Sequence, residues 1–129
     1  MRILLYLAAV CFLGLGLLVF LPWETLNAGM AWLAGEAYPD TPLVIYSVKI
    51  SMVMLAWWGV LMAIAIAEPR AHQTVLLVLG LAFLAVAVAC VVLVRTYALS
   101  AVYYGDAIFA LPVGVLMLTY RRAATENAF

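Results

Sequence analysis

The sequence predicts an all-α integral membrane protein, with four transmembrane helices in an up-down bundle and a short amphipathic helix in the first, external loop. Hydrophobic residues make up 71% of the 129 residues and charged residues only 9%, and the mean hydropathy is +1.24, far above that of a soluble domain. The apolar residues form four stretches of about 20 residues, the length that crosses a bilayer. The chain has room for a single membrane domain, residues 1–129, and its zero net charge gives no reason to expect nucleic acid as a partner.

The four predicted spans cover residues 3–22, 43–67, 74–94 and 101–120. Lipid offers the backbone no hydrogen-bond partners, and no stretch alternates as a barrel strand does, so these spans are helices. The first span follows Arg2 and in this respect looks like a signal peptide. It is too long for a signal core, however, and no small-x-small cleavage site follows it, so we expect a retained helix.

The first loop, residues 23–42, has its own helical periodicity. Apolar residues recur at steps of three and four along it: Trp23, Leu26, Met30, Leu33 and Ala37. This pattern predicts a short amphipathic helix that ends near Gly35 and before Pro39. Such a helix either lies in the headgroup layer, anchored by Trp23 and Trp32, or forms a lid over the outer mouth of the bundle.

The basic residues predict the orientation of the bundle. Four of the six lie on the side shared by the N-terminus, the second loop and the C-terminus: Arg2, Arg70, Arg121 and Arg122. By the positive-inside rule both termini are then cytoplasmic. We expect the membrane to be a bacterial inner membrane.

Asp106 lies in the apolar run of the last span, where a carboxylate is costly unless it is paired, solvated or neutralised. Lys49 lies about six residues into the second span, roughly 9 Å deep, and Asp106 lies at a similar depth from the same side. Arg95 ends the third span at this side, and Tyr46 and Tyr103 can donate hydrogen bonds there. These five residues form a candidate polar cluster. It either fixes which helices are neighbours or lines a pocket whose cations meet the anionic group of an amphipathic small molecule.

Helix packing is predicted from small residues three positions apart, which let backbones approach in lipid. Three such pairs occur: Gly59 with Ala63, Ala85 with Ala89, and Ala110 with Gly114. Trp57 and Trp58 are a candidate partner surface. Adjacent residues differ by about 100° around a helix, so at least one of the two faces lipid or another protein.

The sequence shows no pattern typical of a metal, cofactor or catalytic site. His72 is the only histidine and has no second ligand near it. Cys11 and Cys90 lie at depths that differ by on the order of 10 Å, too far apart for a disulfide. We therefore expect no metal, no cofactor and no catalytic residues.

Two classes of function remain. The chain is either a non-catalytic accessory or scaffold subunit, packing against a larger membrane complex or itself, or a small-molecule binding or transport protein with a polar site in the outer half of the bundle. Small multidrug transporters have a similar length, but they depend on a carboxylate in the first helix, and residues 3–22 contain none. In length, span spacing and the aspartate of its last helix, Asp106, the chain resembles small bacterial four-helix proteins such as the DoxX-like and BphX-like groups. No specific motif supports this resemblance, and no function follows from it.

Overall fold

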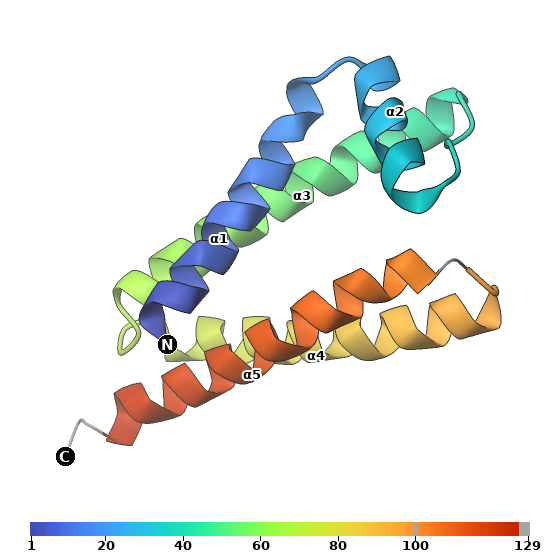
Figure 1. Ribbon diagram of the computed structural model, residues 1–129. Coiled ribbons are helices and arrows are strands. Elements are labelled where there is room, and N and C mark those ends of the chain that lie inside the picture. Colours follow the sequence, from blue (N-terminus) through green and yellow to red (C-terminus); the bar gives the residue numbers. More distant parts are fainter. Residues whose placement is uncertain (100, 127–129) are drawn as a thin grey trace.

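The structure is a computed structural model that describes residues 1–99 and 101–126, and it is helical, with no strand in these ranges (Figure 1). The elements in chain order are α1 (Arg2–Leu17), the 3-10 turn η1 (Leu18–Phe20), α2 (Trp23–Ala34), α3 (Pro42–Ala67), α4 (Gln73–Thr96), the 3-10 turn η2 (Ala101–Tyr103) and α5 (Tyr104–Glu126). Four helical segments are long and apolar enough to cross a membrane: Arg2–Phe20, Pro42–Ala67, Gln73–Thr96 and Ala101–Glu126. The predicted fold class, a four-helix membrane bundle, is confirmed.

The helix predicted in the first loop is also present. α2 spans Trp23–Ala34 and ends at Gly35, whose φ of 78° is the left-handed conformation that suits glycine. Leu26 of its predicted apolar stripe is buried, whereas Leu33 is 62% exposed. The stripe therefore packs against the protein over its first two turns only.

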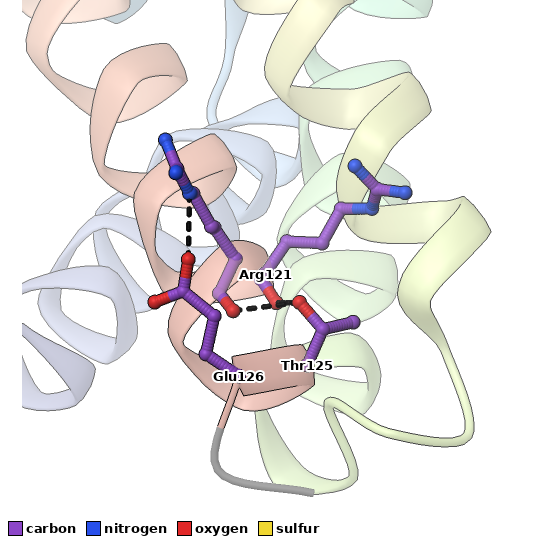
Figure 2. Close-up of polar contacts among 4 residues, drawn as sticks. Arg121, Thr125 and Glu126 are labelled. Atoms are coloured by element: carbon purple, nitrogen blue, oxygen red, sulfur yellow. Dashed lines mark hydrogen bonds and ion pairs between the residues drawn. The ribbon is translucent and has the colours of Figure 1, made fainter. Parts of the chain in front are cut away.

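α5 continues beyond residue 120, where the predicted span ends. Arg122 forms an ion pair with Glu126 at 2.8 Å, and the Thr125 hydroxyl donates to the Arg122 carbonyl at 2.6 Å (Figure 2). Pairs four residues apart on a helix surface support helical structure in water. The helix thus projects past its apolar part.

The four long helices are organised as two hairpins, which we call the first hairpin (α1 and α3) and the second hairpin (α4 and α5). Contacts within each hairpin are extensive, whereas contacts between the hairpins are few (Figure 1). Glycines allow both close pairings: a Cβ added to Gly16 would lie 2.3 Å from the Cβ of Ala56, and one added to Gly80 would lie 2.8 Å from Leu118. Lipid supplies no hydrophobic drive between helices, so this backbone approach provides the packing energy.

The predicted small-residue pairs are present at two of the three positions. Gly59 meets the carbonyl of Ala9 and the backbone of Leu13, and Gly114 meets the carbonyl of Gly80. The third pair, Ala85 and Ala89, is exposed on α4 and lies outside the core. The buried face of α4 carries Gly80, Phe83 and Ala87, which share a stripe at steps of three and four.

The two ends of the bundle differ. The N-terminus, the α3–α4 connection and the end of α5 lie together (Figure 1). We call this the arginine end because these segments contain Arg2, Arg70, Arg121 and Arg122. Arg2 donates to the Ala67 carbonyl at 3.4 Å, and the Tyr120 hydroxyl donates to the Ile66 carbonyl at 3.2 Å. The opposite end, which we call the α2 end, holds α2, η2 and the α4–α5 connection.

The tightest part of the core lies toward the arginine end. The largest fully buried side chains lie in the half of each helix nearest that end: Leu5, Met62, Ile66, Leu76 and Met117. Toward the α2 end the hairpins diverge (Figure 1). The hairpins are therefore packed most closely in the half of the bundle nearest the arginine end.

Candidate functional site

A cavity of about 490 Å³ lies between the two hairpins. All four long helices line it, through Cys11, Phe12, Leu15, Ser51, Met54, Leu55, Trp58, Phe83, Val86, Asp106, Phe109 and Ala110. Its deepest residues are Phe12, Phe83 and Ala110, each at most 7% exposed. Cys11, Leu15, Ser51, Met54, Asp106 and Phe109 are exposed and form its rim. The cavity thus has a buried floor and an exposed rim.

Aromatic rings form much of the cavity wall. The ring of Phe83 lies 5.3 Å from that of Phe12 and 5.3 Å from that of Trp58, and Phe12 lies 5.5 Å from Phe109 (centroid distances). Two of these contacts are edge-to-face, the geometry that aromatic quadrupoles favour. The rings come from all four long helices and form a continuous apolar surface in the cavity.

Asp106 is the only Asp, Glu, Lys, Arg or His side chain among the described residues that line the cavity. It lies in the first turn of α5, where the helix N-terminus stabilises a negative charge. Ser51 stands opposite on α3, with its hydroxyl donated to the Ser47 carbonyl at 2.7 Å. The carboxylate is therefore the one strongly polar group on an apolar, aromatic surface.

The two predicted cations do not join Asp106. Lys49 donates from Nζ to the Leu21 carbonyl at 3.4 Å, at the end of η1, and Arg95 is exposed in the last turn of α4. Over residues 1–99 and 101–126 the single ion pair within 4.0 Å is the one in the C-terminal part of α5, so neither cation pairs with Asp106. Neither lines the cavity. The carboxylate therefore lines the cavity without them, unlike the cation-lined pocket that was one of the two alternatives from the sequence.

The tyrosines of the predicted cluster also separate. Tyr46 is 65% exposed on α3 and lies outside the cavity lining. Tyr103 lies in η2, and its hydroxyl is 3.3 Å from that of Tyr38, in the α2–α3 connection. The Tyr103 carbonyl accepts a hydrogen bond from Cys90 Sγ at 3.0 Å. Tyr38 and Tyr103 therefore link the two hairpins at the α2 end.

The hydrogen bond to Tyr103, together with burial and the negative charge of Asp106 nearby, raises the pKa of Tyr38 to about 12. A phenolate at this position would lose a donor and face another anion. Tyr38 therefore holds its proton at physiological pH and can act as a donor to Tyr103.

The α2–α3 connection is held against α2 by Asn27. Its amide donates to the Tyr38 carbonyl at 2.9 Å and to Asp40 Oδ1 at 3.2 Å, and its side-chain oxygen accepts from the Tyr38 amide at 2.7 Å. Trp23 Nε1 donates to the same Asp40 oxygen at 2.5 Å. This network positions Tyr38 over Tyr103. α2 itself turns Leu26 inward and leaves Trp32 84% exposed, so it has one face on the protein and one face available to the headgroup layer.

Trp57 and Trp58 face different surroundings, as their 100° offset requires. Trp58 lines the cavity and packs edge-on against Phe83. Trp57 is 63% exposed on the outer face of α3. Of the two residues of the candidate partner surface, Trp57 is therefore the exposed one, whereas Trp58 lines the cavity.

Both cysteines are free, as their different depths predicted: Cys11 is exposed on the cavity rim and Cys90 is half-buried.

Sequence reasoning missed the aromatic floor and the role of Asn27. Phe12 has Ala8, Ala9 and Gly16 on its own helix face, and Phe83 has Gly80 and Ala87. A large aromatic residue amid small ones on one face marks a place where helices separate around a ring, and this signal was available in the sequence. The bonds of Asn27 carried no such signal, because they depend on how the connection folds back.

Comparisons of the chain with protein-family models, with curated proteins and with solved structures give no match. The resemblance to DoxX-like and BphX-like proteins is thus limited to length, span spacing and the aspartate.

Proposed function

We propose that this protein binds a small, largely apolar molecule in the cavity between its hairpins, as a membrane-embedded binding or transport protein. The observation that carries the proposal is the cavity of about 490 Å³ with an aromatic floor and one carboxylate on its rim. Ligand sites have volumes of roughly 300–1,000 Å³, apolar walls and few polar groups. Its exposed rim residues belong to the apolar spans, so we expect the ligand to enter from the bilayer.

The arrangement of the hairpins supports this proposal. A cavity that resulted only from loose packing would lower the stability of the fold and serve no function. Here aromatic residues of both hairpins hold the walls in edge-to-face contact, and Tyr38 with Tyr103 spans the gap at the α2 end. The cavity is therefore supported on its floor and at its end.

The test is binding of a neutral apolar fluorophore, N-phenyl-1-naphthylamine, to the full chain in lipid nanodiscs, with empty discs subtracted. We expect saturable binding that Ser51→Phe abolishes, because a ring at this exposed rim position fills the cavity. The matched control is Val88→Phe, which adds the same ring at a residue that is 65% exposed and outside the lining. Binding that is non-saturable, or equal in both variants, would refute the proposal.

We also propose that the arginine end faces the cytoplasm and that the membrane is a bacterial inner membrane. Arg2, Arg70, Arg121 and Arg122 support this orientation, and the acidic loop around α2 then lies outside. In a chain whose native cysteines are replaced by alanine, Glu36→Cys should react with an impermeant maleimide on intact cells. Glu126→Cys should react only after permeabilisation, and the reverse pattern would overturn the orientation.

A second candidate function, an accessory or scaffold subunit, is favoured by Trp57. This residue is 63% exposed at the middle of α3, away from the interfacial belts where tryptophan is enriched. Purification in mild detergent should then retain a stoichiometric integral-membrane partner, or a homo-oligomer, that Trp57→Ala releases and Trp32→Ala does not. A lone monomer would exclude this function.

A further inference from the structure

We infer that the ligand of the inter-hairpin cavity is a lipophilic monocation, with Asp106 as its counter-ion and the aromatic floor as the seat of its apolar body. This inference rests on the proposed function, and it names the ligand class of that same site.

The charge of the lining determines the sign of the ligand. Asp106 is the only Asp, Glu, Lys, Arg or His among the described lining residues, and neither Lys49 nor Arg95 lies within 4.0 Å of it as an ion pair. A carboxylate in an apolar span is costly without a partner. Among the described residues no cation pairs with Asp106, whereas a bound cationic ligand would supply that partner.

The aromatic rings add a second, independent attraction. Ring faces carry negative charge density and attract cations within about 6 Å, most strongly where water is excluded. Phe109 lies on the rim beside Asp106 on α5, and Phe12 and Phe83 form the floor below it. A carboxylate with adjacent aromatic rings favours a delocalised or alkylated cation over a small hydrated one, because such a cation gives up little hydration on entering.

The apolar floor of the cavity limits the ligand to one positive charge. The floor beneath Asp106 consists of Phe12, Phe83 and Ala110 and offers no second anion. A dication would bury one charge without a partner, and an anion would face the carboxylate. A bulky hydrophobic body with one positive centre fits both the volume and the charge.

The test uses tetraphenylphosphonium, a permanent lipophilic monocation, and measures its equilibrium binding to the full chain in nanodiscs near neutral pH. We expect Asp106→Asn to weaken this binding at least about tenfold, because it removes the only carboxylate among the described lining residues. The control is Glu36→Gln, which removes a carboxylate from the exposed connection at the same end of the molecule and should change binding less than about twofold. The anion tetraphenylborate, of the same shape, should not bind above empty discs.

The neutral fluorophore N-phenyl-1-naphthylamine reports whether the cavity is intact in each variant. If Asp106→Asn keeps the fluorophore and loses the cation, the inference holds. If Asp106→Asn and Glu36→Gln both bind tetraphenylphosphonium as the parent does, or both lose that binding to the same extent, the assignment of a cationic ligand is overturned. The proposed binding function then still stands. Loss of both probes in Asp106→Asn would make Asp106 a structural residue and also overturn the assignment. If the parent chain binds neither probe, the proposed function itself fails.

Discussion

Gly16→Ala should destabilise the first hairpin, whereas Gly14→Ala, two residues earlier on the same helix, should not. A Cβ at Gly16 would lie 2.3 Å from the Cβ of Ala56, 2.8 Å from its Cα and 2.9 Å from its amide nitrogen. Nothing lies within 4 Å of the corresponding position at Gly14. The two variants add the same methyl group, so they differ only in what that group meets.

The magnitude follows from the geometry. Carbon atoms in contact are about 3.5 Å apart or more, so α1 and α3 must separate by about 1.2 Å to relieve the 2.3 Å approach. The obstacle includes the backbone of Ala56, which no rotamer change can move. Overpacking of this kind costs about 1–3 kcal/mol. Gly14→Ala carries no such cost and gains up to about 1 kcal/mol in helix propensity.

The assay is reversible unfolding in mixed micelles of a mild detergent and sodium dodecyl sulfate, followed by tryptophan fluorescence. We expect Gly16→Ala to unfold at a lower dodecyl sulfate fraction than the parent, and Gly14→Ala at the same or a higher fraction. If the two variants unfold together, then α1 and α3 do not approach as closely as the structure shows, and the account of hairpin packing is wrong.

Three further predictions concern the α2 end and the cavity wall. Asn27→Ala removes three hydrogen bonds of the connection after α2, so limited proteolysis should cut that connection faster than in the parent; an unchanged cutting rate would show that these bonds do not hold it. In ultraviolet titration of the parent, Tyr38 should ionise near pH 12, and the Tyr38→Phe variant, which lacks this signal, assigns it. Tyr103→Phe removes the hydrogen bond and should move the ionisation of Tyr38 toward pH 10. Because the pKa of Tyr38 is higher in the folded protein, its contribution to folding stability is complete below about pH 10 and is lost as the pH rises toward 12. A titration midpoint of 10 for Tyr38 in the parent would contradict the Tyr38–Tyr103 bond. Trp58→Ala should cost about 2–3 kcal/mol through loss of its ring contact, and Trp57→Ala less than about 0.5 kcal/mol; equal costs would contradict their different exposure.

The spans and α2 could be predicted because each depends on one-dimensional properties of the chain. Runs of apolar residues must be helical in lipid, and a glycine after a periodic stretch ends a helix, as Gly35 does. Neither inference requires knowledge of which helix lies beside which. For the same reason the C-terminal end of α5 was not predicted, since the apolar run stops at Arg121 while the helix continues to Glu126.

The polar cluster could be predicted only in part, because sequence distance gives the depth of a residue but not the direction in which it points. Lys49 and Asp106 were placed at one depth, yet Lys49 turns to the Leu21 carbonyl while Asp106 turns to the cavity. The same limit applies to Ala85 and Ala89, whose spacing alone did not show that they face outward. Azimuth depends on how the hairpins pack, and the pairing of α1 with α3 and of α4 with α5 is a tertiary result.

The division into two hairpins also bears on how the protein is made. Each hairpin joins helices that are consecutive spans of the chain, and its glycine contacts lie within that hairpin. During synthesis, residues 1–67 can complete their close pairing, with α2 already folded against them, before the ribosome has released the second half. The two halves then dock through contacts that run from the Tyr120–Ile66 bond at the arginine end to the Tyr38–Tyr103 pair at the α2 end.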